Sequence, residues 1–367
     1  MKFCFVDRAN AHSIWSLIDI ISIELIKRGD SVLYCKLIEE DTAYTRQVPD
    51  SVQLELIYVP KKKNVLDLLK QVYVFSKKFK NLISDVDVLH TNFAYPGVFA
   101  KYLAANKIPV VITTQHEVYH SMNIHWKVLL NITQKYTDSV VYISEEVEKS
   151  YKTVSSPKCE KITIKNGVNV EYLNEVAKKC KSNSKRMSVV CVGRLVPEKG
   201  QRVLIEAWPI VLQRAPLAKL SILGTGPDED KLKARCVELN ILGNIEFHGW
   251  LPKSDTVEKI ACANLIVVPS QHEGFGLVIA EAMGLRTPLV CSNIDVFHEI
   301  ADDTASYFPP NNHVELARSI LKNLSTGVSD AKLTKALNRV TECFNEKNMA
   351  IKYIELYDKQ LSRKGVL

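Results

Sequence analysis

The sequence contains no uncharged stretch of the roughly 20 residues that a transmembrane helix needs. Asp7 and Arg8 interrupt the N-terminal apolar run, so no secretory signal is expected. Low-complexity tracts and short repeats are also missing, and the composition excludes extended disorder and collagen-like structure. These absences predict a cytoplasmic, globular protein.

Patterned cysteines are missing as well. Nine cysteines are scattered along the chain, and none of them belongs to a CxxC pair. An odd number without a framework is typical of a reducing compartment, so no disulfide framework is expected. Cys191 and Cys262 lie inside apolar runs, and we interpret both as small buried hydrophobic residues.

The excess of charge is small. Over 367 residues, 48 lysines and arginines face 41 aspartates and glutamates, which gives a formal charge of +7. Both signs are dispersed, which argues against a nucleic-acid binder but permits attraction to anionic substrates or membranes. With 46% hydrophobic residues, the chain is long enough for about two domains with cores of their own.

Short apolar segments alternate with longer amphipathic ones, which predicts an α/β fold with parallel sheets and crossover helices. Strands are expected at 2–6, 31–37, 52–59, 87–90, 109–113, 139–143, 161–165, 188–192, 220–223, 245–248, 265–268 and 288–291. The polar run 178–186 is interpreted as a linker. Two doubly wound domains, 1–180 and 181–345, are therefore expected. A C-terminal helix, about 346–367, is expected to pack back on the first domain, and ligands should bind at the carboxyl ends of the strands.

A basic loop follows the strand expected at 188–192. It reads Gly193-Arg194-Leu195-Val196-Pro197-Glu198-Lys199-Gly200 and leads into a helix. Exposed amides, the helix dipole and the two cations Arg194 and Lys199 together suit a phosphate or diphosphate. A basic surface loop without a ligand is the other interpretation.

Two glutamates follow the strand expected at 265–268. Glu273 lies in the loop after the strand, and Glu281 lies about two turns into the next helix. Glycines at 274 and 276 let the backbone approach a ligand closely. Carboxylates suit the hydroxyls of a sugar and a ribose, because they accept hydrogen bonds with two oxygens. Glu281 is open to a second interpretation as a solvated helix residue.

Together these stretches resemble the retaining glycosyltransferases of family 4. The run from Glu273 to Glu281 matches the two-glutamate motif of that family, with seven residues between, and residues 193–200 match its phosphate loop. Residues 165–168, 224–227 and 247–250 match further motifs in the expected order. The resemblance covers nearly the whole chain.

The resemblance implies a GT-B fold, in which two Rossmann-like domains face a central cleft and the second binds most of the nucleotide sugar. Arg194 and Lys199 would neutralise the diphosphate, Glu273 would hold hydroxyls of the donor sugar, and Glu281 would hold the ribose. Backbone amides would surround the sugar and phosphate, and the base would lie near the Trp250 backbone. The other donor-binding residues implied are Gly193, Gly224, Leu251, Gly274, Phe275, Gly276 and Leu277.

The implied activity is transfer of a sugar, glucose or a related hexose, from a UDP-sugar to a hydroxyl acceptor with retention of configuration. Fixed cations and helix amides stabilise the departing diphosphate. Neither a metal nor another cofactor is expected, because no DxD motif follows a strand. Residues 85–87 spell that tripeptide but lead into a strand, and we interpret them as a turn.

The first domain departs from the family pattern. The loop after its first strand, residues 7–13, contains no glycine, so Asn10, His12 or Ser13 would contribute side chains or the acceptor would sit differently. The resemblance places a histidine near the donor sugar, and His116 matches it best. His90 is the second match, and it is equally well explained as a packing residue.

Two alternatives from other classes stay open. His116, Glu117 and His120 spell the HExxH motif of zinc hydrolases, which needs both histidines on one helix, whereas this run directly follows a strand. A non-catalytic nucleotide-sugar binder with the same fold is the other alternative, because the glycine-free first loop leaves room for lost activity.

The stretch Lys61–Lys80 contains seven lysines against Asp67 alone, with apolar residues at helical spacing. One interpretation is a helix in peripheral contact with an anionic membrane at its inner face. The other is a crossover helix that packs on the sheet and exposes its lysines. The first would favour a lipid-linked saccharide acceptor in cell-surface or exopolysaccharide biosynthesis, and a soluble saccharide acceptor remains open.

Overall fold

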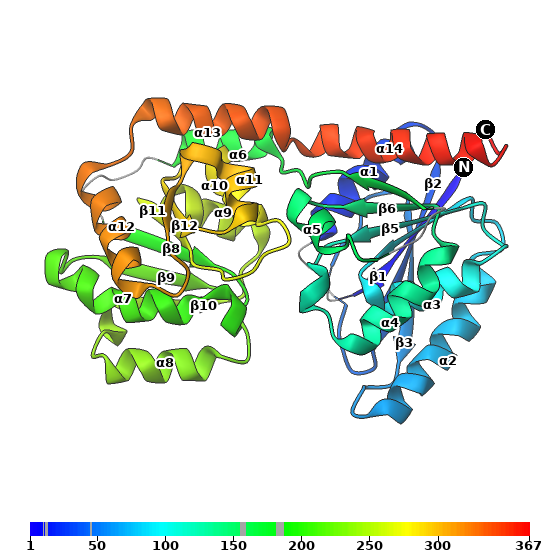
Figure 1. The fold of residues 1–367 in the computed structure, drawn as a ribbon, viewed down its shortest axis with the longest axis horizontal. Helices are drawn as coiled ribbons and strands as arrows, with labels where there is room; N and C mark the ends of the chain where they lie inside the picture. Colours follow the sequence, from blue (N-terminus) through cyan, green and yellow to red (C-terminus); the bar gives the residue numbers. More distant parts are fainter. Residues whose placement is uncertain (10, 12–13, 45, 155–158, 181–186) are drawn as a thin grey trace. The chain divides into compact units, whose positions relative to one another are not determined.

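The computed structural model describes residues 1–9, 11, 14–44, 46–154, 159–180 and 187–367. The chain forms two compact units (Figure 1). The first unit contains Met1–Asn166 and Glu346–Leu367, and the second contains Gly167–Asn345. Each unit is built on one parallel sheet with helices on both faces.

The sheet of the first unit has seven strands in the order β3-β2-β1-β4-β5-β6-β7. The strands are β1 (Lys2–Arg8), β2 (Ser31–Glu39), β3 (Val52–Val59), β4 (Val88–Asn92), β5 (Val110–Gln115), β6 (Ser139–Tyr142) and β7 (Glu160–Thr163). The central strands β4 and β5 are buried along their whole length, because helices cover both faces of the sheet. Both strands therefore begin with buried apolar residues, Val88-Leu89 and Val110-Val111-Ile112, and their polar residues follow toward the carboxyl ends.

The helices of the first unit are α1 (Trp15–Lys27), α2 (Val65–Leu82), α3 (Ala94–Ala104), α4 (Ile124–Thr133), α5 (Glu145–Ser150) and α14 (Glu346–Arg363). Helices α2, α3 and α4 form one layer, in which α3 packs against both of the others. Helices α1 and α14 pack against each other on the opposite face. An ion pair of 2.7 Å between Arg28 and Asp358 ties α14 to this unit, as expected for the C-terminal helix.

The sheet of the second unit has six strands in the order β10-β9-β8-β11-β12-β13. They are β8 (Ser188–Val192), β9 (Lys219–Leu223), β10 (Ile245–Gly249), β11 (Leu265–Val268), β12 (Leu289–Ser292) and β13 (Ser306–Phe308). The helices are α6 (Val170–Lys179), α7 (Gln201–Arg214), α8 (Glu229–Glu238), α9 (Lys253–Ala261), α10 (Leu277–Gly284), α11 (Asp295–Ala301), α12 (His313–Thr326) and α13 (Asp330–Cys343). The sequence prediction of two doubly wound domains is confirmed, except that it missed the short edge strand β13.

The units divide at Asn166 and Gly167 rather than at residue 180. Helix α6 causes the difference, because it packs against α9 and α10 of the second unit. Its Leu173 lies so close to Gly284 that a Cβ there would approach the Leu173 Cδ1 to 2.7 Å. Residues 181–186 of the expected linker lie outside the described residues.

The cysteine predictions were correct for Cys191, which is buried, and wrong for Cys262. Cys262 is exposed and forms a disulfide with Cys180. The packing of α6 on α9 brings the two Cα atoms to 5.3 Å, within the range that a disulfide can bridge. The two residues are 82 positions apart, so no spacing in the sequence indicates the pair.

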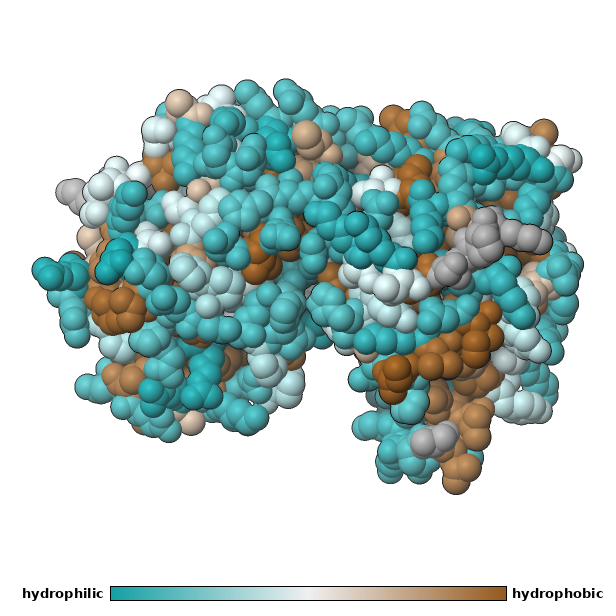
Figure 2. Space-filling model, in the orientation of Figure 1, coloured by the Kyte–Doolittle hydropathy of each residue, from teal (hydrophilic) through white to brown (hydrophobic). Residues whose placement is uncertain are grey.

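The surface of the second unit is mostly hydrophilic in the view of Figure 2, whereas apolar side chains gather on the first unit over α4 and one end of α2. None of the described helices combines the length and the apolar character that crossing a membrane requires.

Candidate active site

The residues predicted to bind the donor lie at the carboxyl edge of the second sheet. Gly193 follows β8, Gly224 follows β9, and Glu273 lies in the loop after β11. These three strands are neighbours, so their following loops meet at one edge. The Gly193 amide donates to the Leu223 carbonyl at 2.9 Å, which holds the first two loops side by side.

Lys199 and Glu273 form a direct ion pair in this edge. The Lys199 ammonium donates to Oε1 of Glu273, and the Ser270 hydroxyl donates to the same oxygen at 3.1 Å. Both charged side chains are less than one-fifth exposed. The cation predicted for the diphosphate and the carboxylate predicted for the sugar therefore share one site, and each neutralises the other before a ligand arrives.

Helix α10 begins beside this pair. Its N-cap, Gly276, has φ +93°, and a Cβ there would come within 2.9 Å of the Phe297 ring. Only glycine fits this left-handed turn, which allows α10 to start at Leu277 directly after the loop. Phe275 is buried and packs against Phe344 with ring centroids 5.7 Å apart, so its side chain belongs to the core. Only the backbone of Phe275 is therefore available to a donor.

Glu281 lies in the second turn of α10 and is not a solvated helix residue. Its side chain is 5% exposed, and its carboxylate accepts a hydrogen bond from the Lys253 ammonium. Lys253 begins α9, shortly after Trp250, whose side chain is 60% exposed. The sequence reasoning missed Lys253. Its only signal there is its position three residues after Trp250 and directly after Leu251-Pro252.

Arg194 is much more exposed than Glu273 and Glu281. Its side chain is 71% exposed, and its guanidinium lies 3.8 Å from Glu198. A solvated pair of this kind contributes little to stability. The backbone of Arg194 is better fixed, because its carbonyl accepts a hydrogen bond of 3.0 Å from the Gln201 side chain. The backbone of Arg194 is therefore fixed by a hydrogen bond, whereas its guanidinium is exposed to solvent.

We expect Gly224→Ala to unfold or distort this edge. Gly224 has φ +131°, and a Cβ there would lie 2.0 Å from the carbonyl oxygen of Gly193. Backbone strain and overpacking together should lower the free energy of unfolding by about 3 kcal/mol, measured by urea denaturation. Gly243→Ala is the matched control, since nothing lies within 4 Å of its Cβ position. Equal effects of the two substitutions would show that the close approach at Gly224 is not needed.

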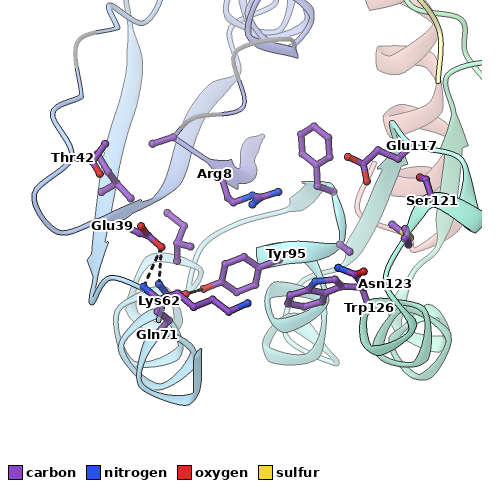
Figure 3. Close-up of a pocket in the computed structure, with 16 residues that line it drawn as sticks. Arg8, Glu39, Thr42, Lys62, Gln71, Tyr95, Glu117, Ser121, Asn123 and Trp126 are labelled. Carbon is purple, nitrogen blue, oxygen red and sulfur yellow. Dashed lines mark hydrogen bonds between the residues drawn. The ribbon is translucent and has the colours of Figure 1, made fainter. Parts of the chain in front are cut away.

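The first unit contains a cavity of about 420 Å³ at the carboxyl ends of its strands. Figure 3 shows three of its lining residues, Arg8 from the end of β1, Lys62 from the loop before α2 and Tyr95 from α3. Trp126 also lines it, with its ring centroid 5.3 Å from that of Tyr95. Glu117 is a further lining residue, and among the described residues neither Arg8 nor the Lys62 ammonium forms an ion pair.

The polar wall of the cavity is held by a chain of hydrogen bonds. The Tyr95 hydroxyl donates to Oε1 of Gln71 at 2.7 Å, and the Gln71 amide donates to the Pro60 carbonyl at 2.6 Å. Glu39 accepts a hydrogen bond of 3.3 Å from the Lys62 amide. Burial raises the pKa of Tyr95, so its hydroxyl stays protonated and remains a donor. Aromatic rings, carboxylates and an amide on one wall suit the faces and hydroxyls of a saccharide.

His116 lies at the end of β5, next to this cavity wall. Its Nε2 is 2.8 Å from Oδ1 of Asn92, and its ring packs on Phe93 with centroids 4.9 Å apart. Burial lowers the pKa of His116 to about 3, so the ring is neutral near pH 7. Nδ1 is buried without a partner among the described residues. If Nε2–H donates to Asn92, Nδ1 is a hydrogen-bond acceptor that a sugar hydroxyl could satisfy.

His90, the second match, is a packing residue. Its two ring nitrogens lie 2.6 Å from the Tyr357 hydroxyl and 2.8 Å from the Thr114 hydroxyl. The ring is buried between β4 and α14, and burial lowers its pKa to about 3. Both nitrogens are therefore already partnered inside the core.

The HExxH run does not form the helix that a zinc hydrolase needs. His116 lies in the coil after β5, whereas His120 lies in a short 3₁₀ turn, Tyr119–Ser121. In the described part of the chain, no three His, Cys, Asp or Glu side chains are grouped closely enough to hold a metal ion. The Asp85–Asp87 tripeptide forms a turn before β4, as expected, and Asp85 pairs with Lys2 at 2.8 Å.

A buried ion pair lies at the start of the glycine-free first loop. Asp7 and Lys36, at the ends of β1 and β2, are 2.6 Å apart and both fully buried. Burial raises the pKa of Asp7, and the Lys36 ammonium opposes that rise. Removing one partner of a buried pair lowers the free energy of unfolding by about 3–5 kcal/mol. The pair therefore stabilises the end of β1, where Arg8 follows Asp7. Asn10, His12 and Ser13 lie outside the described residues.

Comparison with known proteins identifies both units. Residues 18–172 match the model of Glycosyltransferase Family 4, and residues 174–339 match the model of Glycosyl transferases group 1. An uncharacterized glycosyltransferase of Methanocaldococcus jannaschii is 32% identical over 181 residues, which cover 48% of this chain and 46% of that protein. A second relative is the GDP-mannose-dependent monoacylated alpha-(1-6)-phosphatidylinositol monomannoside mannosyltransferase of Corynebacterium glutamicum. It is 29% identical over 208 residues, which cover 52% of this chain and 53% of that protein. The chain spans about half the length of these curated relatives.

Solved structures share the fold at low sequence identity. Sucrose-phosphate synthase from Thermosynechococcus elongatus superimposes with a TM-score of 0.81 at 18% identity, covering 99% of this chain and 100% of that chain. The Anabaena protein HepE, solved with UDP, gives a TM-score of 0.78 at 17% identity, covering 98% and 100%. The two family models together run from residue 18 to residue 339. The chain therefore belongs to the GT-B glycosyltransferases, with a family 4 domain followed by a group 1 domain.

Proposed function

We propose that this protein is a retaining, metal-independent glycosyltransferase that moves glucose or a related hexose from a UDP-sugar to a hydroxyl acceptor. The observation that carries the proposal is the edge of the second sheet, where Lys199, Glu273 and Glu281 lie around the start of α10. The UDP bound by the structural neighbour HepE supports a uridine donor. The GDP-mannose-dependent relative makes GDP the second donor to test.

Each residue of this edge has a role in the proposed transfer. Lys199, Arg194 and the first amides of α10 stabilise the negative charge that builds up on the departing diphosphate. Glu273 accepts hydrogen bonds from hydroxyls of the donor sugar, and Glu281 accepts them from the ribose. The leaving phosphate takes the proton of the acceptor hydroxyl on the same face, which keeps the anomeric configuration. The fixed cations supply the charge that a metal would otherwise provide.

The cavity of the first unit is proposed to hold the acceptor. Tyr95 and Trp126 offer ring faces to a sugar, and Glu117 offers a carboxylate for its hydroxyls. His116 Nδ1 would accept from a hydroxyl beside it. A lipid-linked saccharide is the preferred acceptor, because the relative from Corynebacterium acts on a phosphatidylinositol mannoside. With such an acceptor, the proposed reaction belongs to cell-surface or exopolysaccharide biosynthesis.

Calorimetric titration with UDP, GDP, ADP and UDP-glucose, with and without EDTA, tests the proposal. We expect micromolar binding of UDP that is unchanged by EDTA, because the binding charges are those of the side chains. Stronger binding of GDP than of UDP would mean that the donor is a GDP-sugar. Hydrolysis or transfer of the bound UDP-sugar then separates an enzyme from a binding protein. Absence of binding to all four nucleotides would overturn the proposed function.

A further inference from the structure

Two exposed apolar stripes run along neighbouring helices of the first unit. On α2, Leu66, Leu69 and Tyr73 are 67%, 59% and 69% exposed, at spacings of three and four residues. The apolar residues of α2 therefore lie on two sides of the helix, with Phe75 and Phe79 buried and these three exposed. On α4, the exposed stripe consists of Ile124, Val128 and Ile132, again at helical spacing.

The two stripes belong to one surface, which we call the α2–α4 face. Helix α3 lies between α2 and α4 and packs against both. The Tyr95 hydroxyl of α3 donates to Gln71 of α2, and the Tyr95 ring contacts that of Trp126 of α4, so the three helices are connected into one layer. Figure 2 shows apolar side chains gathered over α4 and one end of α2. Apolar side chains at this density on two adjacent helices indicate a docking surface.

The charge of this face identifies the kind of partner. Seven lysines lie between residues 61 and 80, with Asp67 as the one acidic residue. Lys70, Lys77 and Lys80 lie on the same side of α2 as its apolar stripe, because they follow Leu66 at spacings of 4, 11 and 14 residues. Helix α4 contains no acidic residue. Lysines around exposed aliphatic and aromatic side chains match the headgroups and acyl boundary of an anionic bilayer.

We propose that the α2–α4 face binds the surface of an anionic bilayer, with Ile124, Val128 and Ile132 entering the headgroup layer and the lysines of α2 meeting the phosphates. In the sequence, Leu66 lies between Lys62 and Gln71, and Ile124 directly follows Asn123. Lys62, Gln71 and Asn123 all line the cavity. Binding would therefore bring the rim of the cavity to the bilayer. Delivery of a lipid-linked acceptor from that bilayer is the one step that rests on the proposed function.

Co-sedimentation with vesicles tests the inference on the full chain. We expect binding to phosphatidylcholine mixed with phosphatidylglycerol, weak binding to phosphatidylcholine alone, and release by salt. The triple variant Ile124→Gln, Val128→Gln, Ile132→Gln and the triple variant Lys70→Glu, Lys77→Glu, Lys80→Glu should each reduce binding by about tenfold or more. The matched control is Leu217→Gln with Val237→Gln, which changes exposed apolar side chains of the second unit.

Equal loss in the control variant, or no vesicle binding by the unchanged protein, would overturn the inference. A concentration-dependent dimer in sedimentation velocity that the α4 variant abolishes would also overturn it, because the face would then be an interface between two copies. UDP titration of the same proteins keeps the two proposals apart. Vesicle binding without UDP binding would defeat only the proposed function, and UDP binding without vesicle binding would defeat only the α2–α4 face.

Discussion

Lys199→Ala is expected to weaken UDP binding by about 1.5–3 kcal/mol, measured by calorimetry, because it removes a charge-assisted contact to the diphosphate. The variant also leaves Glu273 without its ion-pair partner, and Glu273 is only 15% exposed. An unpaired carboxylate next to the diphosphate repels it, which places the expected loss toward the upper end of this range. Turnover should fall with affinity, because the same charge stabilises the leaving group.

Lys231→Ala is the control for this substitution. Lys231 is an 83% exposed lysine of the same unit, 3.6 Å from Asp228. Its loss should leave UDP affinity within about 0.5 kcal/mol of the original value. Unchanged UDP affinity in Lys199→Ala would mean that Lys199 serves only to neutralise Glu273.

Glu273→Ala is expected to separate binding from catalysis. UDP carries no donor sugar, so its affinity should stay unchanged or rise slightly, because Lys199 is released from its ion pair. Turnover of the whole UDP-sugar should fall by roughly 100-fold, about 2.7 kcal/mol, since the sugar loses the group that orients it. Calorimetry with UDP and a transfer or hydrolysis assay with UDP-glucose measure the two effects.

Glu238→Ala serves as the matched control, because Glu238 also forms an ion pair, of 2.7 Å with Arg235, but lies at the last residue of α8, at the opposite end of that helix from the loop after β9. This control substitution should change neither the affinity for UDP nor the turnover of the UDP-sugar. A parallel loss of UDP affinity and turnover in Glu273→Ala would assign Glu273 to the architecture of the loop rather than to the sugar.

The sequence predicted the strands well for a physical reason. Strands covered on both faces become continuous apolar runs, and 188–192 and 265–268 were predicted with the bounds that the structure has. The edge strand at 52–59 was also predicted with its bounds, from apolar residues that alternate with Gln53 and Glu55. The edge strand β13 has three residues and no such run. The donor-site loops were also predictable, because phosphate and sugar chemistry requires particular residue types directly after strands.

Features that depend on packing between distant segments were not predictable. The boundary between the units depends on what α6 packs against, and the Cys180–Cys262 disulfide follows from the same packing. Lys253 and Glu281 are 28 residues apart, on α9 and α10, so their ion pair leaves no periodic signal. The exposure of Leu69 depends on which side of α2 faces the sheet, and an amphipathic pattern with apolar residues on both sides does not determine that side.

The position of α14 has a consequence for the order in which the protein is made. The ribosome completes the whole second unit, Gly167–Asn345, before it reaches the helix that finishes the first. Until then, the side of β4 that carries His90 lacks Tyr353 and Tyr357, the aromatic residues that cover it. The second unit can therefore fold during synthesis, whereas the first must keep part of its core open to solvent or to a chaperone until the last helix emerges.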